Sequence, residues 1–211
     1  MLVVNEIFHS IQGESSYAGR PCVFIRLTGC NLRCRYCDTV YAYDDGVSMS
    51  VEEILQNVHR FQCGLVEITG GEPLLQDETP RLAAALLNEG KTVLVETNGS
   101  MDIDVLPEKT IRIMDIKCPS SGESEKMDWD NLSRLNSKDE VKFVVADQND
   151  FDWAVGIVRD YHLESVCVVL FSPVTEQLPA SFLANWILES ELDVRFQLQL
   201  HKILWLDQRG K

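Results

Sequence analysis

Several features that would assign a protein to a class at first sight are missing from this sequence. Its 211 residues include 33 Asp and Glu against 19 Lys and Arg, a formal net charge of −14, and no run of basic residues. Nucleic-acid binders normally present a basic surface to the phosphates, so this balance argues against DNA or RNA as the main ligand. No apolar run approaches the roughly 18 to 20 residues that cross a bilayer. The first residues carry Glu6 and Glu14 and lack the basic start of a signal peptide, which predicts a soluble, cytoplasmic protein.

Internal repeats, low-complexity tracts and linkers rich in proline, glycine or serine are missing too. We therefore expect residues 1–211 to form a single domain. The seven cysteines are an odd number and too few for a disulfide-dense scaffold. Three of the seven lie within residues 30–37, and this clustering requires a chemical reason.

What the chain does contain is an alternation of β-branched runs with helical patterns. The predicted strands are 22–28, 65–69, 92–96, 111–116, 141–146, 165–171 and 194–200. A capping box of Ser50 and Glu53 begins the best-signalled helix, which we expect to end at Gly64. Further helices are predicted at 78–89, 149–162 and 179–189, with a short segment at 129–135. The alternation predicts an α/β fold of parallel units, as an open sheet or an incomplete barrel, because six or seven strands fall short of a closed eight-stranded one.

Polar residues follow five of the predicted strands. They are Arg26 with the cysteine loop, Thr69 with residues 70–73, residues 96–99, Asp115 with Lys117, and His201 with Lys202. Functional residues of parallel β/α folds gather at the carboxyl ends of the strands. We therefore expect these groups to form one site.

The spacing Cys30-x-x-x-Cys34-x-x-Cys37 lies directly after a predicted strand. Three chemistries compete for it: buried thiols that act as small apolar groups, a zinc site completed by Asp38 or a distant ligand, and an iron-sulfur cluster held by three thiolates. Residues 15–37 contain four arginines and no acidic residue, which favours an anionic centre. A cluster with only three thiolates would leave one iron open to an external ligand.

This cysteine loop, with Tyr36 before the last cysteine, resembles that of the radical S-adenosylmethionine superfamily. Gly70-Gly71-Glu72-Pro73 after the next strand is similar to the GGEP motif of the same superfamily. The resemblance implies a 4Fe-4S cluster on Cys30, Cys34 and Cys37, with S-adenosylmethionine on the fourth iron. It also implies an incomplete (β/α)6-type TIM barrel.

Further stretches resemble the 7-carboxy-7-deazaguanine synthase family over nearly the whole chain. They are residues 5–8, 12–14, 24–27, 37–39, 96–99, 115–119 and 199–202. This resemblance implies conversion of 6-carboxy-5,6,7,8-tetrahydropterin to 7-carboxy-7-deazaguanine by a radical-mediated ring contraction with loss of ammonia, a step toward queuosine and related 7-deazapurines. It further implies an external electron donor such as flavodoxin and a homodimer.

The same resemblance assigns roles to individual residues. Thr39 is expected to ligate Mg²⁺. Contacts with S-adenosylmethionine are expected from Tyr36, Cys37, Asp38, Gly71, Glu72, Gly99, Lys117, Cys118 and Pro119. Contacts with the pterin substrate are expected from Ile11, Gln12, Gly13, Glu14, Arg26, Thr97 and His201.

Arg26 can also be placed from the residues alone. It shares a strand face with Phe24 and Thr28, so its guanidinium can point into the barrel. A charge there needs a partner, either the substrate carboxylate or an internal acid such as Glu67 or Glu96.

Two stretches depart from the family pattern. Ser15 stands where glycine is common, and residues 117–119 stand where a Ser-Pro-Lys-like stretch is common. The alternatives from the sequence are another small radical enzyme, such as a glycyl-radical activating enzyme, and a zinc-stabilised binding module.

Overall fold

The computed structural model describes residues 1–206 and 208–210, and within them nine strands form one sheet. The strands are β1 (Leu2–Ile11), β2 (Pro21–Leu27), β3 (Val47–Met49), β4 (Leu65–Gly70), β5 (Thr92–Thr97), β6 (Ile111–Ile116), β7 (Glu140–Val145), β8 (Val168–Pro173) and β9 (Arg195–Phe196). Their order across the sheet is β3-β1-β2-β4-β5-β6-β7-β8-β9.

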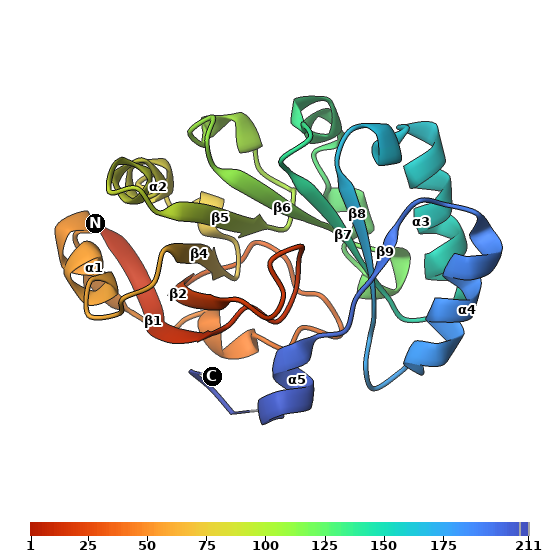
Figure 1. The fold of residues 1–211 in the computed structure, drawn as a ribbon, viewed down its shortest axis with the longest axis horizontal. Coiled ribbons are helices and arrows are strands. Elements are labelled where there is room, and N and C mark those ends of the chain that lie inside the picture. The colour runs from red at the N-terminus through yellow and green to blue at the C-terminus, as the bar shows by residue number, and fades with distance from the viewer. Residues whose placement is uncertain (207, 211) are drawn as a thin grey trace.

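The strands from β2 to β9 pair in parallel, whereas β1 runs antiparallel to both β2 and β3. Strands β6 and β7 are buried along their whole length. Burial on both faces is the expected state of a parallel sheet, and it explains why these strands are rich in β-branched residues. The sheet curves but does not close, so it forms a partial barrel (Figure 1).

Five α-helices accompany the sheet in the described part of the chain. They are α1 (Val51–Val58), α2 (Thr79–Asn88), α3 (Gln148–Asp160), α4 (Ala180–Ser190) and α5 (Leu200–Trp205). Helix α2 packs on β5, α3 on β7 and α4 on β8. Figure 1 shows α1 and α2 beside one end of the sheet and α3 and α4 beside the other. None of the described helices is long and apolar enough to cross a membrane.

Most of the predicted elements are present with small shifts at their ends. The capping box is confirmed, because the Ser50 hydroxyl accepts from the Glu53 amide and the Glu53 carboxylate accepts from the Ser50 amide. Helix α1 ends at Val58, however, six residues before the predicted stop at Gly64. The segment predicted at 129–135 is a 3₁₀ helix over Trp129–Arg134, and β8 begins at Val168 because Leu163–Ser165 forms another 3₁₀ turn.

Two predictions about strands were incomplete or wrong. Strand β1 was not predicted, because Asn5, Glu6 and His9 interrupt its apolar residues. The strand predicted at 194–200 is wrong beyond Phe196. Only β9 pairs with the sheet there, and Leu200–Trp205 is helical, so His201 lies on α5 and not at a strand end.

Candidate active site

A cavity of about 560 Å³ opens at the carboxyl ends of the parallel strands. Most of the residues that the sequence assigned to a site line it. They are Ile11, Gln12, Gly13, Glu14, Arg26, Cys30, Cys34, Tyr36, Cys37, Asp38, Thr39, Gly71, Thr97, Lys117 and His201. Four assigned residues are not part of the lining, namely Glu72, Gly99, Cys118 and Pro119. The predicted groups therefore converge on one cavity, although His201 and Lys202 reach it from α5 and not from a strand end.

The cysteine loop forms one wall of this cavity. Cys30, Cys34 and Cys37 are all half-buried, and the amide of Cys37 donates to the carbonyl of Cys34. Burial raises the pKa of Cys34 to about 11 and also raises that of Cys30. A metal centre would have to displace these protons, as thiolate ligation always requires.

The three half-buried cysteines at one cavity supply soft thiolate donors once they are deprotonated. Iron-sulfur clusters use ligands of this kind, so the residues present fit such a cluster.

Gly70, the last residue of β4, and Gly71 pack closely against the end of β2 and the start of the cysteine loop. A Cβ on Gly71 would lie 2.2 Å from the carbonyl oxygen of Gly29 and 2.5 Å from the Cβ of Cys30. Gly70 has a φ of +149°, and a Cβ there would lie 2.2 Å from the carbonyl oxygen of Leu27. The amide of Glu72 donates to the Gly29 carbonyl over 2.8 Å. Glycine is required at both positions because backbone meets backbone there.

The Glu72 side chain is fully buried and holds the neighbouring loop in place. Its carboxylate accepts from the Thr97 hydroxyl at 2.9 Å, the Asn98 amide at 2.6 Å and the Leu74 amide at 2.9 Å. Burial raises the pKa of Glu72, although these hydrogen bonds favour its ionised form. The Glu72 carboxylate thus ties the ends of β4 and β5 together, and its assignment to S-adenosylmethionine stays a prediction.

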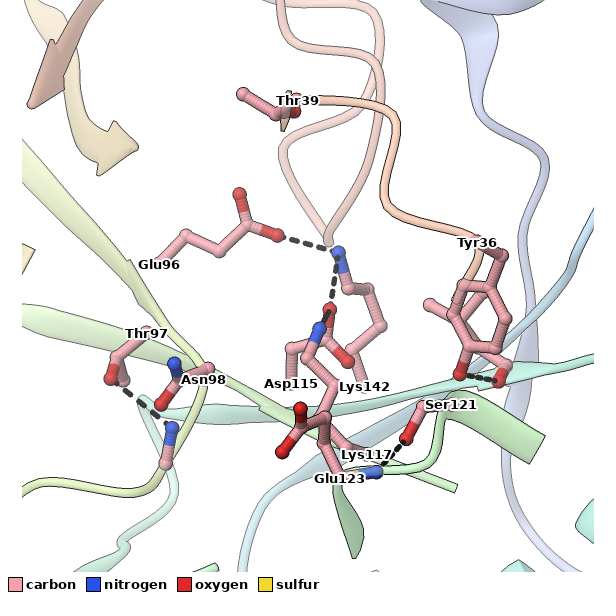
Figure 2. Close-up of polar contacts among 12 residues, drawn as sticks. Tyr36, Thr39, Glu96, Thr97, Asn98, Asp115, Lys117, Ser121, Glu123 and Lys142 are labelled. Atoms are coloured by element: carbon pink, nitrogen blue, oxygen red, sulfur yellow. Dashed lines mark hydrogen bonds and ion pairs between the residues drawn. The ribbon is translucent and has the colours of Figure 1, made fainter. Parts of the chain in front are cut away.

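The ends of β5 and β6 complete the cysteine side of the cavity. The side-chain nitrogen of Asn98 lies 3.9 Å from the Cys30 sulfur and 3.1 Å from the Asn31 side-chain oxygen. Lys117 pairs with Asp115 over 2.7 Å, and this contact is visible in Figure 2. The second oxygen of Asp115 is buried and has no hydrogen-bond partner among the described residues. A polar atom of this kind at a cavity wall is available to a bound ligand.

Arg26 also lines the cavity, as expected, but has an unexpected partner. Its Nε donates to Glu6 over 2.8 Å, and Glu6 lies directly across the ladder on β1. The rings of Phe8 and Tyr41 both lie 5.7 Å from the guanidinium carbon. The suggested internal partners, Glu67 and Glu96, are not in contact with it as ion pairs within the described chain. The sequence missed Glu6 because β1 was not recognised as the neighbouring strand.

The loop after β1 carries other polar groups of the cavity. Gln12 donates to Glu67, and a Cβ on Gly13 would lie 2.6 Å from Nδ1 of His201. Burial raises the pKa of Glu67 well above its ordinary value, and the nearby Glu96 carboxylate adds to the increase. Gly13 therefore allows α5 to approach the loop closely.

Glu14, the third residue of this loop motif, is held from two directions. Lys142 on β7 donates to it over 2.9 Å, and Gln199 donates to it over 2.9 Å. Burial alone would raise the pKa of Glu14, but Lys142 and His201 outweigh it and lower the pKa. The carboxylate is thus ionised and faces the cavity that it lines.

Asp38 and Thr39 follow the last cysteine and also face the cavity. The Thr39 hydroxyl donates to Asp38 over 2.9 Å, and Asp38 pairs with Lys202 of α5 over 3.4 Å. The pKa of Asp38 is lowered because Lys202 outweighs the effect of burial. Two adjacent oxygen donors at a cavity are ligands of the kind that Mg²⁺ prefers.

Several lining residues were not found from the sequence. Lys142, Tyr41 and Arg209 are the clearest cases, and Arg209 stacks on the Tyr41 ring at 3.9 Å. One signal did exist, because a lysine in the middle of an otherwise apolar buried strand is rarely without a partner. Nothing comparable marks Tyr41 or Arg209, whose positions depend on contacts between distant segments.

Comparison with known proteins agrees with this geometry. Residues 24–117 match the model of the radical SAM superfamily, and the fold with its three-thiol cavity defines the chain as a radical S-adenosylmethionine enzyme. The chain is 46% identical to the 7-carboxy-7-deazaguanine synthase of Chlorobaculum tepidum, over 99% of this chain and 97% of that protein. It is 43% identical to the enzyme of the same name from Koribacter versatilis, over 96% of each.

The chain therefore belongs to the 7-carboxy-7-deazaguanine synthase family. The crystal structure of QueE from Escherichia coli has the same fold, with a TM-score of 0.79 and 24% identity, over 94% of this chain and 93% of that one. The predicted α/β partial barrel is confirmed by this likeness. The two alternatives from the sequence, a zinc-stabilised binding module and a glycyl-radical activating enzyme, do not agree with these matches, because the relatives align over nearly the full length and are 7-carboxy-7-deazaguanine synthases.

Proposed function

We propose that this chain converts 6-carboxy-5,6,7,8-tetrahydropterin to 7-carboxy-7-deazaguanine with loss of ammonia, a step toward queuosine and related 7-deazapurines. One observation carries the proposal beyond family membership. The three cysteines, the cation of Arg26 and the anion of Glu14 all line a single cavity. The thiols proposed to hold the cluster and the charged side chains suited to bind a charged heterocycle therefore line the same cavity.

Cys30, Cys34 and Cys37 would hold the 4Fe-4S cluster, and S-adenosylmethionine would bind beside it along Gly71 and Lys117. When bound, the cluster and S-adenosylmethionine supply the one-electron chemistry that begins the reaction. The residues of this chain have a different task. They exclude water and hold the pterin in one orientation, so that only the intended position reacts.

Arg26 is suited to bind the substrate carboxylate. Glu6 occupies its Nε, which leaves the two terminal nitrogens of the guanidinium for a ligand. Two parallel N–H donors match a carboxylate well. The stacked rings of Phe8 and Tyr41 limit the motion of the guanidinium, so little side-chain entropy is lost on binding.

The pterin ring would lie between Arg26 and the loop after β1. Glu14 and the side-chain oxygen of Gln12 can accept hydrogen bonds from the ring N–H and amino groups. His201 lies against Gly13 and faces the same part of the cavity. Thr97 lines the cavity from β5, although its hydroxyl also donates to Glu72.

Mg²⁺ would bind at Thr39 with substrate oxygens and water. The adjacent Asp38 carboxylate supplies negative charge at this point, and Lys202 holds it in place. A hard cation with few protein ligands is the usual arrangement for Mg²⁺, which keeps several waters.

We further propose that the chain is a single domain that forms a homodimer and receives its electron from an external donor such as flavodoxin. Phe182 and Leu188 on α4 are exposed apolar side chains that a second copy would cover. The molecular mass in solution, measured by light scattering, tests the dimer.

The activity itself is tested with anaerobically reconstituted protein, 6-carboxy-5,6,7,8-tetrahydropterin, S-adenosylmethionine, Mg²⁺ and a chemical reductant. We expect 7-carboxy-7-deazaguanine and ammonia in equal amounts, with less than one 5′-deoxyadenosine per product. Release of one 5′-deoxyadenosine for each turnover, or no formation of 7-carboxy-7-deazaguanine, would refute the proposal.

A further inference from the structure

Lys142 is the most deeply buried cation of the cavity. It lies in the middle of β7, and its side chain is 5% exposed. Its ammonium lies 2.5 Å from Glu96, 2.9 Å from Glu14 and 3.5 Å from Asp115. Figure 2 shows it between Glu96 and Asp115. Three carboxylates from three separate parts of the chain thus share one buried ammonium.

The charge state of Lys142 follows from these contacts. Burial alone would lower the pKa of Lys142, but the carboxylates of Glu14, Glu96 and Asp115 outweigh it and raise the pKa well above its ordinary value. The ammonium is therefore retained at neutral pH. Without it, Asp115 would keep Lys117 as its partner, but Glu14 and Glu96 would lose the cation between them, and their mutual repulsion would be weakly screened.

Glu14 depends on Lys142 for its orientation. One of its oxygens accepts from Lys142 and, at 3.3 Å, from Gln197. The other accepts from Gln199 at 2.9 Å. The two glutamines approach from the segment before α5, whereas Lys142 approaches from the central strands. A carboxylate has about four acceptor positions, so this arrangement leaves capacity for a ligand.

The same strand secures the loop at a second point. Glu140, two residues before Lys142 and on the same strand face, accepts from the Ser16 amide at 3.0 Å. Strand β7 therefore holds both ends of the segment 14–16. A displacement of the carboxylate by even 1 Å would disturb hydrogen bonds to a ligand, because these weaken quickly with distance and angle.

We propose that Lys142 is a positioning residue that fixes the charge and direction of Glu14 and so sets the specificity of the site for a ring that presents an amino N–H donor, such as the 2-amino group of a pterin. The inference rests on the proposed function, since it assigns part of that substrate's recognition. A ring with an oxygen in place of the 2-amino group would face the Glu14 carboxylate with a lone pair and be rejected.

Ligand binding without turnover provides the test. Full-length, cluster-reconstituted protein is titrated with 6-carboxypterin, which is fluorescent and oxidised, and with 6-carboxylumazine, which carries oxygen in place of the 2-amino group. The variants are Lys142→Met, Glu14→Gln and the double variant. Lys109→Met, at an exposed lysine outside the cavity, is the matched control.

The wild type and Lys109→Met should bind 6-carboxypterin on the order of 10- to 100-fold more tightly than 6-carboxylumazine, as expected for a charge-assisted hydrogen bond. Lys142→Met should lose most of this preference with the cluster absorbance unchanged. In the double variant, the preference should equal that of Glu14→Gln within about threefold, because Lys142 acts through Glu14.

The proposal is overturned if the wild type shows no preference, if Lys142→Met retains it, or if the two substitutions add independently. A role in folding alone would change the melting temperature and leave the ratio of the two dissociation constants intact. If Lys142→Met does not fold, Lys142→Gln, which keeps N–H donors without the charge, takes its place in the same titrations. A wild type that binds 6-carboxypterin selectively and forms no deazaguanine would refute the proposed reaction and leave this assignment standing.

Discussion

The two walls of the cavity are built in different ways. The cysteine wall, formed by residues 29–37, 70–73 and 97–99, depends on backbone contacts and on glycines that admit no Cβ. A second group of residues, which we call the charged wall and which comprises Arg26, residues 12–16, Lys142 and residues 197–201, depends on charged and amide side chains. Glu14 and its partners Lys142 and Gln199 are more than 100 positions apart in the sequence.

This difference predicts different sensitivities to substitution. Backbone packed on backbone has no side chain that can move aside, so one added atom displaces the whole cysteine loop. A wall of side-chain ion pairs tolerates changes of shape better than changes of charge, because an uncompensated buried charge is costly. Substitutions on each wall can therefore confirm or refute the contrast.

The largest effect is expected from Gly71→Ala. Its Cβ would lie 2.2 Å from the carbonyl oxygen of Gly29, far inside van der Waals contact, and a backbone atom cannot rotate aside as the end of a flexible side chain can. We expect the variant to lose most of its iron-sulfur cluster. Iron content and absorbance after anaerobic reconstitution measure the loss.

Gly64→Ala is the control for that substitution. No atom lies within 4 Å of a Cβ built on Gly64, which is exposed before β4. The control should load iron as the wild type does. A Gly71→Ala protein that also binds a full cluster would show that the backbone wall is more adaptable than its geometry indicates.

Arg26→Ala should have the next largest effect, and on the other wall. It removes the cation proposed for the substrate carboxylate and, within residues 1–206 and 208–210, leaves Glu6 with only the Tyr41 hydroxyl as a polar partner. We expect KM for the pterin to rise on the order of 10- to 100-fold, about 1.5 to 3 kcal/mol, with a normal cluster spectrum. Arg20→Ala, at an exposed arginine just before the same strand, should leave KM unchanged. Loss of the cluster in Arg26→Ala would instead show that Arg26 supports the structure of the cysteine loop.

Glu72→Gln tests a side chain that lies behind the backbone wall. The carboxylate accepts from Leu74, Thr97 and Asn98, and an amide would present an NH₂ group to at least one of these donors. We expect a loss of about 1 to 3 kcal/mol in the free energy of unfolding, seen as a lower melting temperature. An unchanged melting temperature together with weaker binding of S-adenosylmethionine would instead support the direct cofactor contact that the sequence predicted.

Thr39→Ala should have a smaller effect, because it removes one oxygen donor from a site where water can replace it. The expected result is a shift of the Mg²⁺ dependence of product formation to a several-fold higher concentration, with an unchanged maximal rate. Val40→Ala, at the exposed neighbouring residue, should not alter the dependence. If Thr39→Ala also left the Mg²⁺ dependence unaltered, the proposed ligand would be wrong.

The contrast between the walls also explains what could be predicted from the sequence. The cysteine loop and the turn after β4 are contiguous motifs, so their residue types and spacing were enough to predict the wall that they form. The alternation of strands and helices predicted the parallel sheet in the same way, because each unit is local. The roles of individual side chains stay predictions that the experiments above address.

The other wall could not be assembled from the sequence, because its contacts join distant segments. Lys142 meets Glu14 only once β7 and the loop after β1 are placed in the sheet. Strand β1 was missed because polar residues interrupt it, and with it the partner of Arg26. The prediction of a strand at 194–200 was wrong at its end, where the backbone turns into α5. There the side chain of Gln197 accepts from the Ser15 amide, and that of Gln199 donates to Glu14.

Ser15→Gly should have the smallest effect, and it separates backbone strain from side-chain bonding within one residue. Ser15 has a φ of +66°, in the left-handed region where a Cβ costs roughly 1 to 2 kcal/mol, and glycine would relieve this cost. Glycine would also lose the hydrogen bond from the Tyr17 amide to the Ser15 hydroxyl, worth about 1 kcal/mol, and would have more freedom to lose on folding. These terms oppose each other, so we expect the free energy of unfolding to change by less than about 1 kcal/mol in chemical denaturation. Ser16→Gly, at an exposed position without positive φ, also loses one side-chain hydrogen bond, from Arg195 to the Ser16 hydroxyl at 3.0 Å, and so provides the comparison that lacks only the strain. A destabilisation well above that of Ser16→Gly would mean that the side chain of Ser15 is part of the charged wall, and not simply a serine tolerated where glycine fits.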